Sequence, residues 1–233
     1  MTFDETAKKI GTGAQAEVLL YQGYAYKIYK PSYPTEWIEF EKRQQKAVND
    51  AGLCDVRYYD TDDDHIIKMD FVDGDTLEKR ALTGDISCFN ILADAFRFVH
   101  EKDATQTDMP RLEDTAWMGL KDDEKEEVLG IISHLSEKME RKVCHLDMHF
   151  LNIMLPKEKD YVIIDWMNAR LAPEVFDYAR TYVIFDEFSK EGLEAYKAIV
   201  MPDLWKKGIK EADFEAAVRA SKIIRNREKN ETN

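Results

Sequence analysis

Three oxygen-bearing side chains in the second half of the chain could bind a metal ion and position a hydroxyl group. Asp147 is followed five residues later by Asn152, and Asp165 comes eighteen residues after Asp147, directly behind the apolar pair Ile163-Ile164. Carboxylate and amide oxygens are the ligands that Mg²⁺ prefers, whereas zinc favours histidine and cysteine. The pattern indicates phosphoryl transfer, in which Asn152 and Asp165 hold Mg²⁺ and Asp147 orients a hydroxyl and accepts its proton.

Four residues near the N-terminus could bind phosphate groups, although each one alone also has an ordinary explanation. Gly11 and Gly13 precede a predicted strand, where glycine lets backbone N–H groups approach phosphate oxygens closely, but a plain turn fits as well. Lys27, in the predicted strand 24–29, could pair with phosphate or be an exposed edge lysine. Glu41, on a predicted helix, could hold Lys27 by an ion pair or be one more solvated glutamate.

The elements that must position these residues change in character near residue 74. Short alternating segments predominate before it and predict a sheet, because alternation is the pattern of half-buried strands. A helix interrupts them, with Gly52 at its end. The expected elements are strands 16–21 and 24–29 joined by a tight turn at Gln22-Gly23, a helix over 35–51 capped by Thr35 with Trp37, Phe40, Gln44 and Val48 near one face, and strands 56–60 and 65–72.

Helical spacing of apolar residues predominates after Gly74. The expected elements are helices over 86–100 and 122–139, a short β-like interlude at 153–155 and 161–164, and helices from Glu174 onward with a break at 201–203. Together the two halves predict an α+β fold with a small antiparallel lobe plus one helix over residues 1–74 and a larger, mainly helical lobe over 75–233.

Composition limits the classes of partner. The chain has 33 Lys and Arg against 46 Asp and Glu, so its net charge is 33 − 46 = −13. This acidic excess argues against binding nucleic acid or an anionic membrane surface, because both select basic patches. Neither a signal peptide nor a membrane span is expected. Three separated cysteines (Cys54, Cys88 and Cys144) predict buried, reduced thiols and a cytoplasmic protein. The oligomeric state is not specified.

The order and spacing of these motifs resemble the protein-kinase-like fold, and more closely its aminoglycoside phosphotransferase and choline kinase branch. The segment 145–152, His-Leu-Asp-Met-His-Phe-Leu-Asn, is similar to that branch's H-G-D-x-H-x-x-N motif. The segment 163–166, Ile-Ile-Asp-Trp, is similar to its I-I-D-W motif, and 177–180, Asp-Tyr-Ala-Arg, to its D-x-A-R helix start. The resemblance covers about residues 8 to 190.

The resemblance implies a bilobal enzyme that transfers the γ-phosphate of ATP to a hydroxyl of a small molecule, such as an aminoglycoside, choline or an amino alcohol. The glycines would cover the phosphates, and the lysine, fixed by its glutamate, would pair with them. The backbone of the segment linking the lobes would meet adenine. The implied site consists of Gly11, Gly13, Lys27, Glu41, Asp70 and Val72 for the nucleotide, Asn152 and Asp165 for Mg²⁺, and Asp147 as the catalytic residue.

The chain departs from the family pattern at several points. Ala16 stands where a third loop glycine is usual, and Leu146 replaces the branch's glycine without supplying an arginine, which puts the conformation of that loop in question. His149 is interpreted as a packing or capping residue. Only eleven residues separate Asp165 from Asp177, about half of what a peptide-binding platform needs in this family, so a peptide substrate is disfavoured.

Two alternative functions stay open: a compact protein-directed kinase or ATPase resembling the RIO-type kinases, and a nucleotide-binding pseudokinase. The acceptor could be cationic, because several acidic residues of the late helices could line its pocket. The same acids could equally form a solvated helix face. These residues are Asp186, Glu187, Glu191 and Glu194.

Overall fold

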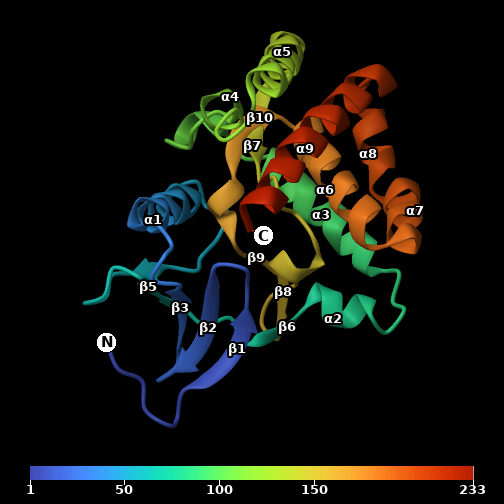
Figure 1. The fold of residues 1–233 in the computed structure, drawn as a ribbon. Helices are drawn as coiled ribbons and strands as arrows, with labels where there is room; N and C mark the ends of the chain where they lie inside the picture. Colours follow the sequence, from blue (N-terminus) through green and yellow to red (C-terminus); the bar gives the residue numbers. More distant parts are fainter. Residues whose placement is uncertain (233) are drawn as a thin grey trace.

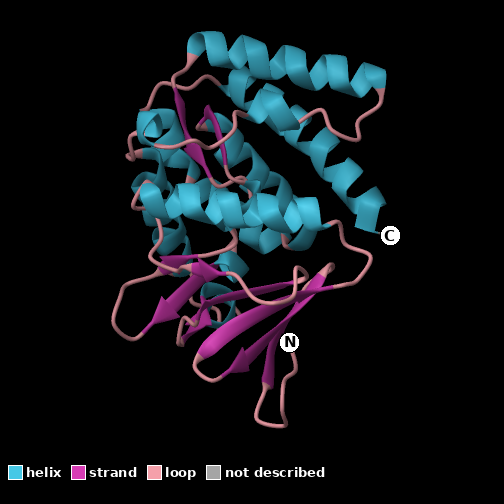
Figure 2. Ribbon diagram, turned by 90° about the vertical axis from the view of Figure 1, so that its left-hand side faces the viewer, coloured by secondary structure: helices cyan, strands magenta, loops and turns pink. Residues whose placement is uncertain are grey.

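The computed structural model of the chain describes residues 1–232 and has a mixed α+β architecture. An antiparallel sheet lies at one end of the molecule with one long helix beside it, and most other helices gather at the opposite end (Figure 1, Figure 2). The predicted fold class is therefore confirmed. The boundary between residues 74 and 75 stays a prediction.

The N-terminal sheet is built around a tight hairpin. Gln22 and Gly23 between its strands both have positive φ, 49° and 80°, as a two-residue hairpin turn requires. A small apolar cluster of Ala16, Tyr29, Ile38 and Ile67 packs the helix against the sheet. The elements are β1 (Lys8–Thr12), β2 (Ala16–Tyr21), β3 (Tyr24–Tyr29), α1 (Thr35–Asp50), β4 (Tyr58–Tyr59) and β5 (Ile66–Asp70), with strand order β1-β2-β3-β5-β4.

Helix α1 differs from its prediction in its cap and in its buried face. Pro34 occupies the N-cap position, and Thr35 is already helical and makes no cap. Trp37 is exposed, and the buried face is largely polar. Gln44 and Gln45 satisfy their side-chain amides there by donating to the carbonyls of Ala169 and Val56. The buried face of α1 consists of Ile38, Glu41, Gln44, Gln45 and Val48.

The helical half is organised around α6. Ten of the fourteen residues of this helix are buried, so its polar residues Asp177, Arg180 and Thr181 lie inside the protein and need partners there. The further elements are α2 (Leu77–Ala81), α3 (Cys88–His100), η1 (Ala104–Gln106), α4 (Leu112–Thr115), α5 (Asp122–Lys138), β7 (Arg141–Cys144), η2 (Phe150–Asn152), η3 (Trp166–Asn168), β10 (Arg170–Pro173), α6 (Val175–Phe188), α7 (Lys190–Ile199), α8 (Met201–Lys206) and α9 (Glu211–Thr232).

The helix break expected at 201–203 is the start of α8, with Pro202 in its first turn. The three cysteines are buried, as predicted. Among the described helices, none combines the length and the apolar character needed to cross a bilayer.

A small three-stranded sheet joins the segment between the two halves to the helical half. It consists of β6 (Gly74–Thr76), β8 (Ile153–Pro156) and β9 (Val162–Ile163) in the order β6-β8-β9. Gly74 lies so close to β8 that a methyl group on it would come within 2.5 Å of the Leu155 carbonyl oxygen. Only glycine therefore fits at this crossing.

We expect Gly74→Ala to lower the free energy of unfolding by about 1–3 kcal/mol, because the two strand backbones would have to separate. Gly130→Ala is the matched control. No described atom lies within 4 Å of the added methyl in α5, and removing a helical glycine is expected to raise the unfolding free energy by about 0.5–1 kcal/mol. Urea unfolding measures both variants, and coinciding midpoints would contradict the expectation.

Candidate active site

Lys27, Glu41 and Asp165 meet between the N-terminal sheet and the helical half. The Nζ atom of Lys27 lies 2.8 Å from Glu41 Oε1 and 3.6 Å from Asp165 Oδ1. Burial alone would lower the pKa of Lys27, but the charges of Asp165 and Glu41 raise it well above its usual value. The lysine is therefore a fixed cation.

Glu41 is the most enclosed member of this group, with only 2% of its surface exposed. Besides Lys27, the hydroxyls of Tyr29 and Tyr58 donate to its carboxylate, the latter at 3.3 Å. Burial raises the pKa of both tyrosines, which keeps them protonated as donors. Sequence reasoning assigned neither tyrosine, although Tyr29 shares the strand face of Lys27 at a spacing of two.

Asp147 and Asn152 are joined directly. The Asn152 Nδ2 donates to the Asp147 carbonyl at 2.9 Å and to its Oδ2 at 3.2 Å. Burial alone would raise the pKa of Asp147, but the hydrogen bond and charge of His149, followed by the charge of Arg180, hold it well below its usual value. Asp147 is thus an ionised acceptor at neutral pH.

His149 performs the capping function expected of it. Its Nδ1 accepts a hydrogen bond from the Leu151 N–H at 3.3 Å and so caps η2. Its Nε2 also lies 3.5 Å from Asp147 Oδ2. The imidazole therefore both shapes the loop and faces the carboxylate.

His145 connects Asp147 to the strand that leads into Asp165. Its Nδ1 accepts the Asp147 N–H at 3.2 Å, so its Nε2, 3.0 Å from the Ile164 carbonyl, carries the proton. Burial lowers the pKa of His145, which agrees with a neutral ring. The two segments that carry the candidate metal ligands are thereby held together.

Asp177 anchors the backbone just before Asp147. Its fully buried carboxylate accepts the N–H groups of His145 at 3.0 Å and Leu146 at 2.8 Å. The His100 Nε2 lies 2.9 Å from the same carboxylate. The sequence pattern singled out Asp177 as part of a D-x-A-R helix start, but it gave no indication of His100.

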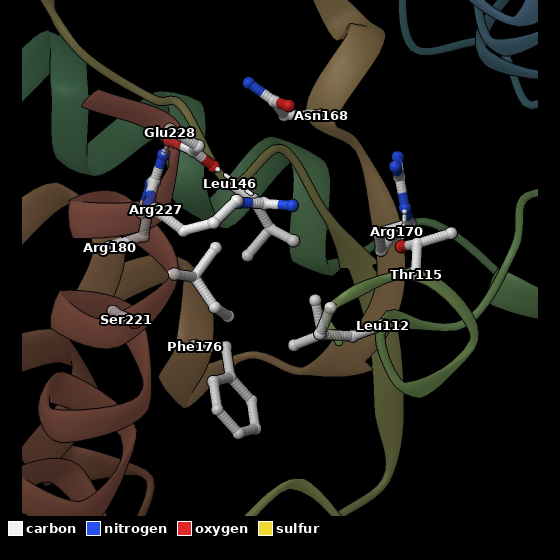
Figure 3. A pocket seen from close by; sticks show the side chains of 12 residues that line it. Leu112, Thr115, Leu146, Asn168, Arg170, Phe176, Arg180, Ser221, Arg227 and Glu228 are labelled. Atoms are coloured by element: carbon white, nitrogen blue, oxygen red, sulfur yellow. Dashed lines mark hydrogen bonds and ion pairs between the residues drawn. The ribbon is translucent and has the colours of Figure 1, made fainter. Parts of the chain in front are cut away.

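Leu146 adopts a left-handed conformation, with φ of 59°, at the position where the H-G-D motif that the sequence resembles has glycine. Its side chain lies at a hollow of about 80 Å³ between α4, α6 and α9 (Figure 3). A left-handed leucine costs about 1–2 kcal/mol, and burying its side chain contributes about 1.5–3 kcal/mol. The burial of Leu146, whose side chain lines this hollow together with Leu112 and Phe176, offsets the backbone cost, so the loop keeps its shape without glycine.

His100 lies between two carboxylates in the interior. Its Nε2 faces Asp177, and its Nδ1 lies 3.1 Å from Glu174 Oε2, which also pairs with Lys207. Burial alone would lower the pKa of His100, but the hydrogen bond to Asp177 and the nearby carboxylate of Glu174 raise it above 6.5. The protonated ring therefore faces two negative charges, that of the buried Asp177 and that of the partly exposed Glu174.

We expect the stability advantage of the wild type over His100→Gln to depend on pH. Because the folded pKa is raised, the stabilisation is fully present below about pH 6.5 and is lost as pH rises through the folded value. Urea midpoints of both proteins between pH 5 and 9 measure this difference. A difference that stays constant or grows with pH would contradict it.

Five of the predicted site residues line a cavity of about 490 Å³ between the sheet and the helical half. Gly13 does not line it, and its N–H donates to the Ala16 carbonyl at 2.8 Å. The Asp70 carboxylate is bonded to the Arg57 N–H and the Tyr59 hydroxyl, so its backbone is what remains to face the cavity. The five residues are Gly11, Lys27, Asp70, Val72 and Asp165.

The glycines of the first loop are not required by the chain itself. Neither Gly11 nor Gly13 has a positive φ. A methyl group on Gly11 would make only an ordinary contact, 3.5 Å from Val18, and one on Gly13 would lie 3.6 Å from the Ala16 carbonyl. Glycine at these two positions is therefore explained better by a bound ligand than by contacts within the chain.

Asp147 and His149 line a second cavity, of about 970 Å³, which we call the α2–α7 groove. Leu151 belongs to the walls of both cavities, so the two spaces adjoin at the loop that carries Asp147. The groove is lined by Glu78, Ala81, Leu82, Gly84, Asp85, Ile86, Phe89, Asp147, His149, Phe150, Leu151, Ile184, Phe185, Phe188, Ser189, Glu191, Gly192, Ala195 and Arg225.

Of the four late acidic residues considered above, Glu191 alone lines this groove. The other three are engaged in ion pairs with basic residues. Asp186 pairs with Lys222 at 3.0 Å, Glu187 with Arg225 at 3.2 Å and Lys229 at 2.5 Å, and Glu194 with Lys197 at 2.8 Å.

Comparison with known proteins gives one family match and several structural likenesses. Residues 6–203 match the sequence model of the phosphotransferase enzyme family. The structure is similar to an aminoglycoside phosphotransferase from Streptomyces rimosus (TM-score 0.67, 16% identity, covering 95% of this chain and 93% of that one).

It is also similar to an ethanolamine kinase from Plasmodium vivax (TM-score 0.63, 13% identity, covering 96% of this chain and 76% of that one). A choline kinase from Streptococcus pneumoniae gives a TM-score of 0.54 at 17% identity, covering 94% and 93%. No curated protein matches the sequence significantly. At these identities the likenesses concern the fold, and they agree with the predicted bilobal, protein-kinase-like architecture.

Proposed function

Because the chain belongs to the phosphotransferase enzyme family, we propose that it transfers the γ-phosphoryl group of ATP to a hydroxyl of a small molecule. One observation carries the proposal: the cavity lined by Lys27 and Asp165 and the groove lined by Asp147 share Leu151 as a wall. A phosphate donor in the first space and an alcohol in the second would meet beside Asp147. Such positioning is the main source of catalysis in phosphoryl transfer.

The first cavity has the composition expected of a nucleotide site. Apolar side chains such as Val18, Ala25 and Met69 would face a base, while Lys27 would pair with phosphates. Within the described residues, the Val72 N–H bonds to no other backbone group, so it is available to adenine. The Asp70 backbone would face the base beside it. Glycine at position 11 would leave room for phosphates beneath β1.

The donor set suits Mg²⁺. Since Asn152 Nδ2 is directed at Asp147, its Oδ1 is the free atom of the amide, and no described residue donates to it. The half-exposed Asp165 carboxylate supplies oxygen ligands next to Lys27. Asn152 and Asp165 would hold Mg²⁺, whose chemistry is to offset negative charge on a phosphoryl group.

The chain's own residues would then perform three tasks. Lys27, held by Glu41, would pair with the phosphates. Asp147, ionised and fixed by Asn152, would accept the hydrogen bond of the attacking hydroxyl and take its proton as the new bond forms. Asp177 would keep the loop in position through its two backbone contacts.

The groove favours a cationic acceptor. Its charged lining includes Glu78, Asp85 and Glu191 besides Asp147. Its two basic lining residues among those described are both engaged, Arg225 with Glu187 and His149 with Asp147. Two structures of similar fold are described as choline and ethanolamine kinases, and both of these alcohols carry a cationic nitrogen and a hydroxyl. An amine-bearing alcohol fits this lining.

An ADP-release assay with Mg²⁺ and ATP tests the proposal across choline, ethanolamine, aminoglycosides and neutral sugars. We expect ADP release that depends on an amino alcohol and stops when EDTA removes Mg²⁺. Binding of ATP without ADP release for any acceptor would overturn the proposal in favour of a pseudokinase. Release that requires an added protein would do so in favour of a protein-directed kinase.

A further inference from the structure

The most exposed apolar side chains of the protein gather around one opening. Among the large hydrophobic residues that the structure describes, the four most exposed are Leu82 (81%), Phe188 (72%), Ile86 (61%) and Leu151 (47%). All four line the α2–α7 groove. They come from three segments that are far apart in sequence, so their convergence is a property of the fold.

These side chains do little for folding, because residues so exposed bury little apolar surface. Exposed apolar patches that border a cavity are a mark of ligand or partner binding. The patch is continuous with the groove interior, where the rings of Phe89, Phe150 and Phe185 pack at centroid distances of 4.9 to 5.5 Å. The groove thus presents an apolar wall from its aromatic floor to its rim.

The polar part of the groove lining is acidic. Asp147 lies in the same cavity, together with Glu78 and Glu191. Asp85 already forms an ion pair with Arg80 at 2.6 Å, so it is less available to bind a cationic ligand. The groove therefore combines acidic side chains that suit an ammonium group with a long apolar surface that neither a small amine nor a polycationic sugar would cover.

We propose that the phosphoryl acceptor is amphiphilic: an amino alcohol whose hydroxyl reaches Asp147 and whose alkyl or aromatic body covers Leu82, Ile86 and Phe188. This inference rests on the proposed function and names its substrate class. In the reaction the acceptor oxygen bonds to the γ-phosphorus, the bond from that phosphorus to the bridging oxygen breaks, ADP leaves, and the hydroxyl proton passes to Asp147.

The experiment compares ethanolamine with N-butyl- and N-hexylaminoethanol in the ADP-release assay. Each buried methylene contributes about 0.8 kcal/mol, close to fourfold in kcat/KM, so even partial burial predicts a rise of at least about tenfold from ethanolamine to the hexyl compound. Leu82→Ser combined with Phe188→Ser is expected to remove most of this rise. Both positions are exposed, so the double variant should fold. Trp37→Ser is the control: Trp37 is an exposed apolar residue of α1 outside the groove, so this variant should retain the rise in kcat/KM with chain length.

A flat or falling dependence on chain length, with ethanolamine still phosphorylated, overturns the inference and leaves the proposed function intact. Dissociation of a wild-type dimer by the double variant in sedimentation also overturns it, because the patch would then be an interface between two copies. If no alcohol is phosphorylated, calorimetry of N-hexylaminoethanol binding tests the amphiphile site independently of the proposed phosphotransfer. Binding weakened at least tenfold by the double variant supports an amphiphile site, and equal binding by both proteins excludes it.

Discussion

Asp147→Asn is expected to lower acceptor-dependent turnover about 10²–10⁴-fold. The carboxylate lines the groove proposed for the acceptor, and its pKa is held low, so it is the ionised group that can accept the hydroxyl proton. Asparagine keeps the size of the side chain and loses the charge. ADP release measured at saturating ATP gives the effect on kcat.

Nucleotide binding separates this effect from misfolding. Asp147 does not line the cavity proposed for ATP, so the Kd for the nucleotide in Asp147→Asn should stay within about threefold of wild type, a change below about 1 kcal/mol. Asp160→Asn, in the exposed turn before β9, is the matched loss of one carboxylate and should retain full turnover. Undiminished turnover in Asp147→Asn would contradict the assignment.

Asp177→Ala is expected to cost about 3–5 kcal/mol in the free energy of unfolding, the range for removing one partner of a buried charge pair. The substitution leaves two backbone N–H groups, those of His145 and Leu146, without their acceptor in the interior. It also leaves His100 without one of its carboxylates. Urea unfolding at pH 6, where His100 is protonated, measures the loss.

Asp186→Ala is the control on the same helix. That carboxylate is exposed and pairs with Lys222 on the surface, so its loss should change stability by less than about 1 kcal/mol. Asp177→Asn keeps one acceptor oxygen and should recover part of the stability. Equal costs for Asp177→Ala and Asp186→Ala would show that the buried carboxylate does not anchor the loop.

The parts of the site that the sequence could predict are those carried by local spacing. Residues 145–152 form one loop, and 163–165 form the strand end beside it, so their proximity follows from short chain distances. Lys27 and Glu41 were linked through the family pattern, and the structure brings them to 2.8 Å. The Gln22-Gly23 turn was predictable because its residues favour a hairpin.

What could not be predicted depends on tertiary contacts. Helix α1 buries Gln45 beside the expected Gln44 because a backbone carbonyl of another segment lies opposite it, and its apolar Trp37 faces outward. Hydrophobic periodicity cannot anticipate such partners. For the same reason the contact between His100 and Asp177, 77 residues apart in the chain, had no sequence signal.

The close crossing at Gly74 bears on how the molecule moves. Strand β6 is paired with β8 of the helical half, so the segment that joins the two halves is not a flexible linker. A rigid-body movement of one half against the other would have to change the backbone torsions of residues 71–73, between β5 and β6. The bond from Gln44 to the Ala169 carbonyl adds a second point of attachment across the cleft. Exchange of the nucleotide proposed for this cavity is therefore expected to need only small relative movements of the lobes rather than their wide separation.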